Sequence, residues 1–254
     1  MEAYATAAQV YAAGLVFARV GALVMLIPGL GDPVVPPRIR LSFALIFAMM
    51  LAPMVSKGLV VPATVGGMGA QVIQEVLIGL MIGAILRMTM GALAVTGEIV
   101  SIQTTLSFAQ TANPALGGQA GAALGSFLGL MGVVLIMTTD LHHLFIGAVF
   151  NSYNIFPFGR TPPVNDATTL AVQTFSGSFS LGVQLAAPII VFSLVFNIAT
   201  GLVGRVMPQF QIYFVSSPLA VILGLSLFAI TMGAVGMIWM DHVRDVVGAF
   251  GGHL

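Results

Sequence analysis

The chain has 254 residues, of which 58% are hydrophobic and only 6% are charged, and its mean hydropathy is +1.07. A soluble domain carries about 25% charged residues, so this composition indicates an integral membrane protein. Eight basic and eight acidic residues give a formal net charge of zero, which provides no basic surface for nucleic acid. The absence of cysteine excludes a disulfide framework, a thiolate metal site and a cysteine nucleophile.

Apolar runs of about 20 residues, enough to cross a hydrocarbon core of about 30 Å, predict about six helical segments. The predicted segments are residues 7–27, 41–56, 72–96, 120–150, 174–203 and 218–240. The second ends near Pro53 and the fifth contains Pro188, so we expect several segments to be kinked or broken. The runs lack the alternating pattern of an outer-membrane barrel, and the predicted fold class is an all-α integral membrane protein with long, partly broken helices.

The connections between these segments differ in character. Residues 28–40 are rich in proline and glycine and end on Arg38 and Arg40, which indicates a rigid turn with a cationic end. Residues 57–69 form a glycine-rich link, and residues 151–173 are expected to form an exposed connector. Lysine and arginine are shared equally between the two sides of the six-segment arrangement, so the positive-inside rule gives no orientation. Either some segments are not simple spans, or assembly with other subunits sets their orientation.

Residues 97–125 form a polar, almost uncharged stretch between two apolar segments. The stretch holds one acidic residue, Glu98, and mixes Gln, Thr, Ser and Asn with Leu106 and Phe108. Irregular backbone at membrane depth is tolerated only where it is buried in protein or lines a water-filled cavity. We therefore interpret the stretch as a pore-lining or pore-closing loop. The alternative is a plain connector between two helices.

Small residues spaced four apart let membrane helices approach each other closely. One unbroken series of this kind consists of Gly117, Gly121, Gly125 and Gly129. Gly79 and Gly83 repeat the spacing in the third segment. Both patterns predict extensive helix packing, either within the chain or with partner chains.

Ionisable groups inside apolar segments cost about 2.5–3.5 kcal/mol each on insertion scales, and they usually face a partner or a water-filled path. The groups of this kind are Arg19, Glu75, Arg87, Glu98, Asp140, His142 and His143. Arg87 and Glu98 share a helical face but lie about 16 Å apart along the axis, so they cannot pair directly. We expect Glu75, Arg87 and Glu98 to make buried polar contacts with other helices.

Asp140, His142 and His143 allow two interpretations. They could form a proton relay, because histidine titrates near neutral pH, or a helix-end cluster with its charges near the membrane interface. No metal site is expected, because adjacent histidines do not share a helical face and no H-E-x-x-H motif is present. The sequence also has no nucleophile elbow and no phosphate loop, so neither catalytic residues nor a cofactor are predicted.

Two motifs carry a resemblance to a known family. Residues 204–214 read GRVMPQFQIYF, and residues 36–40 read PPRIR. Together with Leu-Ser-Phe-Ala at residues 106–109 and the His142-His143 pair, their order and spacing resemble the FliR/SctT family of export-gate proteins in type III secretion. The residues that depart from the family pattern are Thr105 and Leu141, where glycine is common, and Gln211, where asparagine is frequent.

The resemblance implies a single export-gate membrane domain over residues 1–254. A FliP-like portion would be followed by a FliQ-like hairpin, with the join near residues 151–173. The loop between the third and fourth segments would sit in the pore and close it. The implied plug residues are Leu106, Ser107, Phe108 and Pro114, and the implied structural turns or assembly contacts are Arg38, Arg40, Arg205, Pro208 and Gln209.

The function implied by the resemblance is that of a multi-pass, non-enzymatic component of the flagellar export gate in the bacterial inner membrane, within the basal body. The implied partners are FliP and FliQ, which would form the pore with this chain, and also FlhB, FlhA, the lipid bilayer and unfolded rod, hook and filament subunits. The alternative, from a different class, is a proton-coupled transporter of small solutes that uses Asp140 and His142.

Overall fold

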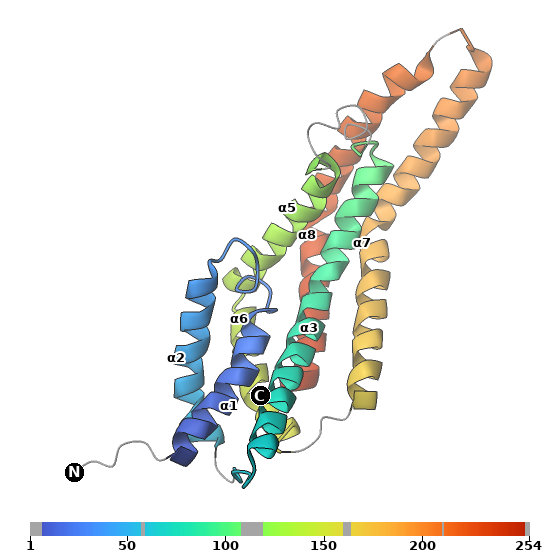
Figure 1. Cartoon of the computed structure of the whole chain (residues 1–254). Coiled ribbons are helices and arrows are strands. Elements are labelled where there is room, and N and C mark those ends of the chain that lie inside the picture. Colours follow the sequence, from blue (N-terminus) through green and yellow to red (C-terminus); the bar gives the residue numbers. More distant parts are fainter. Residues whose placement is uncertain (1–6, 57–58, 108–118, 160–163, 210, 252–254) are drawn as a thin grey trace. The chain divides into compact units, whose positions relative to one another are not determined.

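The computed structural model describes residues 7–56, 59–107, 119–159, 164–209 and 211–251, and this part of the chain is helical without any strand (Figure 1). The helices are α1 (Ala7–Val24), α2 (Pro37–Val55), α3 (Val65–Gln103), α5 (Gln119–Thr138), α6 (Leu141–Ile155), α7 (Val164–Val206) and α8 (Ile212–Gly251). Five of them are long and apolar enough to cross a membrane, and α5 with α6 forms a bent pair that makes up to six. The expected all-α membrane class is therefore confirmed.

The fourth predicted segment is two helices instead of one. α5 ends at Thr138 and α6 begins at Leu141, with Asp140 between them in the left-handed region at φ 58°. A residue in that region cannot continue a right-handed helix, so the helix is interrupted there. Pro188 lies inside α7, which continues through it as one helix, so the fifth segment is not broken there.

Three helices are much longer than the apolar runs indicate. α3 has 39 residues, α7 has 43 and α8 has 40. At 1.5 Å per residue they are about 58 to 65 Å long, roughly twice the thickness of a hydrocarbon core. Apolar runs measure the length that lipid tolerates, whereas the flanks of these runs, which mix polar and apolar residues, are still helical. These helices are therefore not simple spans of minimal length.

Two compact units can be distinguished within the chain. Unit 1 comprises Met1–Thr89, Thr139–Phe175 and Val243–Leu254, and unit 2 comprises Met90–Thr138 and Ser176–His242. The expectation of one export-gate domain over residues 1–254 stays a prediction.

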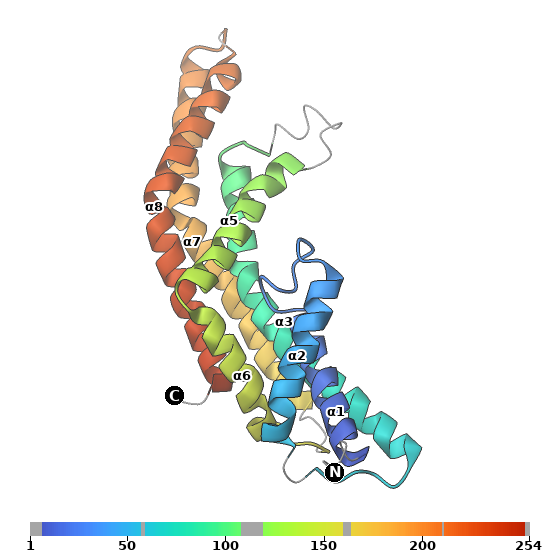
Figure 2. The ribbon, with the colours of Figure 1, turned by 90° about the vertical axis from the view of Figure 1, so that its left-hand side faces the viewer.

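Unit 1 is built around α1, which lies beside α2 and packs against it (Figures 1 and 2). The side chains of Leu15, Val16 and Leu23 on α1 are at most 1% exposed. Gly79 and Gly83 let α3 approach the same stretch closely: a Cβ on Gly79 would overlap the Arg19 carbonyl oxygen, and one on Gly83 would lie 2.9 Å from the Leu26 Cβ. The two glycines therefore pack helices within the chain.

Unit 2 is built from parts of α3, α5, α7 and α8, which cross at glycines. A Cβ on Gly182 of α7 would lie 2.8 Å from the Val95 Cβ on α3. Thr96 tightens that crossing, because its hydroxyl donates to the Gly182 carbonyl at 3.1 Å. Trp239 of α8 is fully buried, and its ring lies against Gly132 of α5. The helices of unit 2 thus pack through close backbone approach at small residues, as is common in membrane bundles, where the hydrophobic effect does not favour helix contact over lipid contact.

The expectation that residues 151–173 form an exposed connector is wrong. α6 continues to Ile155 and α7 begins at Val164, so only the short segment between these residues connects them. Ser152 and Tyr153 are buried side chains of α6. Their burial follows the helical spacing of Phe145 and Val149, which the polar letters of this stretch conceal.

Candidate functional site

Both ends of the predicted pore loop, residues 97–125, are helical instead of irregular: residues 97–103 belong to α3 and residues 119–125 begin α5, while residues 108–118 lie outside the described part of the chain. α3 ends at Gln103, and residues 104–107 form a turn in which the Ser107 amide donates to the Ser101 carbonyl at 3.2 Å. Thr105 has φ 60°, a region that costs a residue with a Cβ about 1–2 kcal/mol. Glycine is common at this position in the family that the sequence resembles, and the backbone conformation gives a physical reason for that preference.

Residues 103–107 form the root of this loop, and side-chain contacts hold the root to both α7 and α8. These two helices are joined by a short turn and are called the α7–α8 hairpin. The Ser193 hydroxyl of α7 donates to the Gln103 amide oxygen at 3.0 Å. The hydroxyls of Thr105 and of Ser217 on α8 lie 3.4 Å apart. The beginning of the loop is therefore fixed within unit 2 by polar contacts.

A close backbone approach adds to these contacts. Thr104 is fully buried, and its hydroxyl donates to the Val100 carbonyl at 2.8 Å. Its methyl group occupies the space that a Cβ on Gly224 of α8 would need. Leu106 and Ser107, two of the predicted plug residues, are half-buried in the same turn. The plug residues that lie outside the described part of the chain are Phe108 and Pro114.

The predicted glycine series has one member in a close helix crossing. A Cβ on Gly97 of α3 would lie 2.5 Å from both the Cα and the amide nitrogen of Gly125 on α5. A Cβ on Gly129 would meet no atom within 4 Å. Gly121 lies in α5, whereas Gly117 is outside the described residues. The role of the whole series in packing stays a prediction.

Unit 1 contains a buried ion pair between Arg19 of α1 and Glu75 of α3. The Arg19 Nε donates to Glu75 Oε2 at 2.6 Å and Nη2 donates to Oε1 at 3.1 Å. Both side chains are buried, at 0% and 2% exposure. This bidentate geometry is the strongest form of an arginine–carboxylate contact, and it compensates for the removal of both charges from water.

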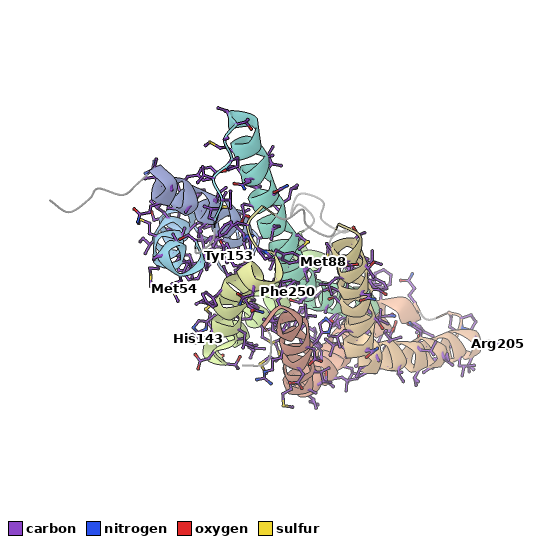
Figure 3. All side chains as sticks on the ribbon, turned by 90° about the horizontal axis from the view of Figure 1, so that it is seen from below. Met54, Met88, His143, Tyr153, Arg205 and Phe250 are labelled. Carbon is purple, nitrogen blue, oxygen red and sulfur yellow. The ribbon has the colours of Figure 1, made fainter. Side chains whose placement is uncertain are left out.

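The same guanidinium joins these helices to the end of α6. Nη1 donates to the Ser152 carbonyl at 3.1 Å and lies 3.3 Å from the Ser152 hydroxyl, while Nη2 donates to the Phe156 carbonyl at 2.8 Å. The Tyr153 ring, labelled in Figure 3, stacks on the guanidinium, with its centroid 4.0 Å from Cζ. Arg19 therefore caps the carboxyl end of α6 with all of its donors engaged.

Arg19 and Glu75 are recognisable in the sequence as charges inside apolar segments, whereas the residues of α6 that contact Arg19 are not. Ser152 and Tyr153 fall within the expected connector of residues 151–173, which Pro157, Arg160, Pro162 and Pro163 indicate. The helical repeat from Phe145 through Val149 to Ser152 is the signal that could have found them.

The other two predicted buried contacts are at the surface of the chain. Arg87 pairs with Asp32, but the two side chains are 44% and 25% exposed. Glu98 is exposed on α3. Burial of Arg87 and Glu98 within the chain is therefore not observed, and their burial against partner chains stays a prediction.

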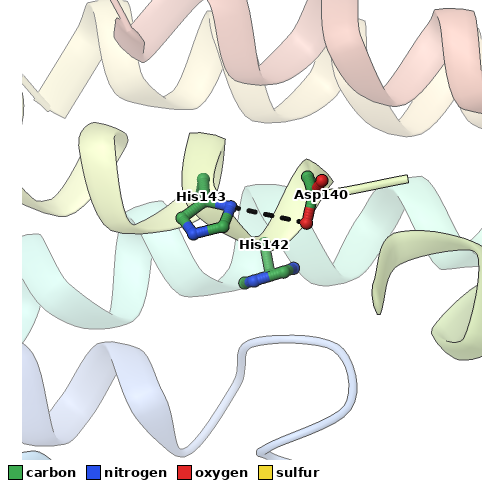
Figure 4. Close-up of side chains that lie close together, drawn as sticks. All are labelled: Asp140, His142 and His143. Carbon is green, nitrogen blue, oxygen red and sulfur yellow. Dashed lines mark ion pairs between the residues drawn. The ribbon is translucent and has the colours of Figure 1, made fainter. Parts of the chain in front are cut away.

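The three ionisable residues at the start of α6 lie together (Figure 4). Asp140 occupies the N-cap position but makes no side-chain capping hydrogen bond, and its Oδ1 lies 3.7 Å from Nδ1 of His143. The ring centroids of His142 and His143 are 4.2 Å apart. One ligand atom from each of the three residues falls within 4.8 Å of the others. The left-handed conformation of Asp140 therefore brings the carboxylate and both imidazoles to one place.

The predicted turn residues are mostly exposed. Pro208 and Gln209 lie in the turn between α7 and α8, and Arg205 is in the last turn of α7, with no side-chain hydrogen bond to a described residue. Arg38 is exposed in the first turn of α2, whereas Arg40 reaches back to the Gly31 carbonyl at 3.4 Å. Arg40 thus fastens the turn before α2, while contacts of the others stay predictions.

Most of the described helices are apolar and long enough to span a membrane, and a polar loop begins at the end of one of them. The chain is therefore a multi-pass membrane protein. A family model described as bacterial export proteins, family 1, matches residues 10–246. The flagellar biosynthetic protein FliR of Caulobacter vibrioides is 61% identical over 251 residues, covering 98% of this chain and 100% of that protein. FliR of Escherichia coli K12 is 29% identical over 214 residues, covering 84% and 81% respectively. FliR of Bacillus subtilis is 25% identical over 235 residues, covering 91% and 88%.

The chain therefore belongs to the FliR family of bacterial export proteins. It is accordingly a multi-pass protein of the bacterial inner membrane and a component of flagellar protein export.

Proposed function

We propose that this chain forms the flagellar export pore together with FliP and FliQ subunits, and that residues 97–125 close the pore between export events. Unfolded rod, hook and filament subunits would pass through it. FlhB and FlhA would act beside it in the same apparatus. The chain would catalyse no reaction, since its part is to line and seal a passage.

The observation that carries this proposal is the fixed root of the loop. Gln103 and Thr105 are bonded to α7 and α8, and Thr104 is buried against Gly224. A loop that acts as a plug needs a rigid base, because a closed passage leaks if its barrier can drift. A plain connector between helices would need no such attachments.

The surface of the α7–α8 hairpin supports assembly with other chains. A groove of about 610 Å³ lies near the tip of the hairpin and is lined by side chains of both helices. Large apolar side chains around it are exposed, including Val203 at 49%, Phe214 at 73% and Leu219 at 46%. A helix that is about twice as long as the hydrocarbon core extends beyond it, and an apolar end outside the core is stabilised better by partner helices than by water.

The alternative function, a proton-coupled solute transporter, relies on Asp140 and His142. Asp140 and His143 are more than two-thirds exposed on the chain, so the described residues do not enclose a proton path at this place. No other observation favours transport of small solutes.

Co-purification tests the proposal. The chain, carrying an affinity tag without histidine, would be co-expressed with FliP and FliQ and analysed by native mass spectrometry. We expect one complex that contains all three proteins. A Leu219→Asp substitution in the groove should reduce the recovered complex, while Val34→Asp, at an apolar residue outside the hairpin that is even more exposed, should not. Recovery of the chain alone, with FliP and FliQ assembled without it, would contradict the proposal.

A further inference from the structure

The strongest feature that the proposed function leaves unused is the group of Asp140, His142 and His143. It combines two imidazoles with one carboxylate, which is a donor set that suits zinc, nickel, cobalt or ferrous iron. Adjacent histidines in a regular helix point about 100° apart, and for that reason no metal site was expected from the sequence. At the start of α6 the two rings nevertheless lie with centroids 4.2 Å apart.

The distances are close to those of a metal site. Two atoms that each lie about 2.1 Å from one zinc ion are at most about 4.2 Å apart. The three ligand atoms fall within 4.8 Å of one another, so small side-chain rotations bring them to that spacing. The exposed Asp140 and His143 side chains are free to make such rotations.

Two further observations favour a ligand at this place. An aspartate at a helix N-cap usually accepts a hydrogen bond from the first turn, but the Asp140 carboxylate does not and is directed toward His143 (Figure 4). The Nδ1 atom of His142 is buried and has no hydrogen-bond partner among the described residues. A buried ring nitrogen without a partner is unfavourable, and a metal ion would fix the ring and its tautomer.

The position at a helix start opposes a cation, because the helix dipole is positive there. The negative charge of Asp140 offsets this effect locally. Neutral imidazoles add no charge to the site, since a metal-bound histidine carries no extra proton.

We propose that Asp140, His142 and His143 bind one divalent transition-metal ion of the zinc type. Three protein ligands leave at least one coordination position for water or for a group from another chain. The ion would tie the left-handed residue before α6 to the first turn of that helix.

The test uses the full chain in detergent, with any subunits that co-purify, and with a tag free of histidine. His253, which lies outside the described residues, is replaced by alanine throughout. After removal of metal with a chelator, Zn²⁺ is added and the bound metal is measured by elemental analysis. We expect about one zinc ion per chain, and Co²⁺ in its place should give the visible absorption of cobalt bound by nitrogen and oxygen.

Single substitutions identify the ligands. His142→Ala, His143→Ala and Asp140→Asn should each weaken Zn²⁺ binding by about tenfold or more, since even an outer-shell change costs that much. Asparagine tolerates the left-handed conformation, so Asp140→Asn removes the charge and keeps the backbone. His242→Ala is the matched control, because His242 lies 3.1 Å from the Ser178 hydroxyl in unit 2 and should leave binding unchanged. The proposal would be overturned if the chain that retains Asp140, His142 and His143 binds clearly less than one zinc ion, or if the three variants bind zinc as well as that chain does.

Discussion

At the scale of single residues, the Arg19 guanidinium is the group on which unit 1 depends most. It bonds Glu75 on α3 and two carbonyls at the end of α6, and Tyr153 covers its face. Replacing a buried ion pair by apolar residues is often neutral, whereas removing one partner leaves a buried, unpaired charge. The correct placement of α1, α3 and α6 thus depends on the Arg19 side chain.

The first prediction separates this pair from an exposed one. Arg19→Met should lower the free energy of unfolding by about 3–5 kcal/mol, because Glu75 is left buried and unpaired. Arg87→Met, which breaks the exposed pair with Asp32, should cost about 1 kcal/mol or less. Unfolding of the detergent-solubilised protein by increasing sodium dodecyl sulfate measures both.

The double variant Arg19→Met with Glu75→Met provides the control for the first prediction. It should be more stable than Arg19→Met alone, because no charge is left buried. Equal losses for Arg19→Met and Arg87→Met would mean that the buried pair has no special role in stability.

The second prediction concerns Thr105 at the loop root. Glycine relieves the left-handed strain but adds backbone entropy and loses the contact with Ser217, so Thr105→Gly should change the stability little. Thr105→Ala retains the strain and also loses the contact, and it should be less stable than Thr105→Gly by about 1 kcal/mol. Thermal unfolding of the two variants measures the difference. If the alanine variant is the more stable one, Thr105 does not adopt a left-handed conformation in the membrane protein.

At the scale of elements, glycine positions decide which helices touch. Gly97 and Gly125, at the two ends of the predicted pore stretch, allow α3 and α5 to cross backbone against backbone. The spacing of small residues predicts that such crossings exist, but it does not say which glycine meets which helix. Gly125 meets α3, while Gly129, one turn later, meets nothing within 4 Å.

The third prediction uses this contrast. Gly97→Ala should destabilise the protein by about 1–3 kcal/mol, because the added Cβ would lie 2.5 Å from backbone atoms that cannot rotate away. Gly129→Ala should be neutral or stabilising by up to about 1 kcal/mol, since alanine favours the helix and has room there. Both are compared by unfolding in the same detergent. Equal effects of the two substitutions would show that α3 and α5 do not cross at Gly97.

The sequence predicts the existence and order of the helices well, and their ends poorly. Apolar runs place all the spans, because lipid contact demands apolar side chains. They miss the helical flanks of α3, α7 and α8, where polar residues interrupt the apolar run but the backbone is still helical. They also miss the break at Asp140, because no glycine or proline marks it and the left-handed conformation of an aspartate is decided by tertiary context.

At the scale of the whole molecule, the sequence predicts the candidate site only in part. The polar stretch of residues 97–125 is recognisable because uncharged polar residues between apolar segments are unusual. Its attachments to Ser193 and Ser217 are not recognisable, because they join residues about 90 and 112 positions apart through short side chains that occur in any helix. The contacts of Arg19 with α6 are hidden because two of the acceptors are the backbone carbonyls of Ser152 and Phe156, which any residue carries.

The apolar surface of the molecule agrees with a subunit of a larger assembly. In the most hydrophobic stretches of α2 and α8, only 22% of residues are buried within the chain. The remainder faces lipid or other subunits. We propose that those subunits are FliP and FliQ, and that the loop held by the α7–α8 hairpin seals the passage that this chain forms with them.

Ion leakage through the assembled complex tests this claim most directly. Phe108→Ala, or deletion of residues 107–113, is compared with Phe127→Ala, which removes an exposed ring of α5 that is 49% accessible. We predict that the two loop variants make cells or reconstituted vesicles leak small ions, while recovery of the complex with FliP and FliQ stays normal. The Phe127→Ala complex should remain tight. Normal permeability of the loop variants with normal recovery, or poor recovery without leakage, would contradict a pore-closing role.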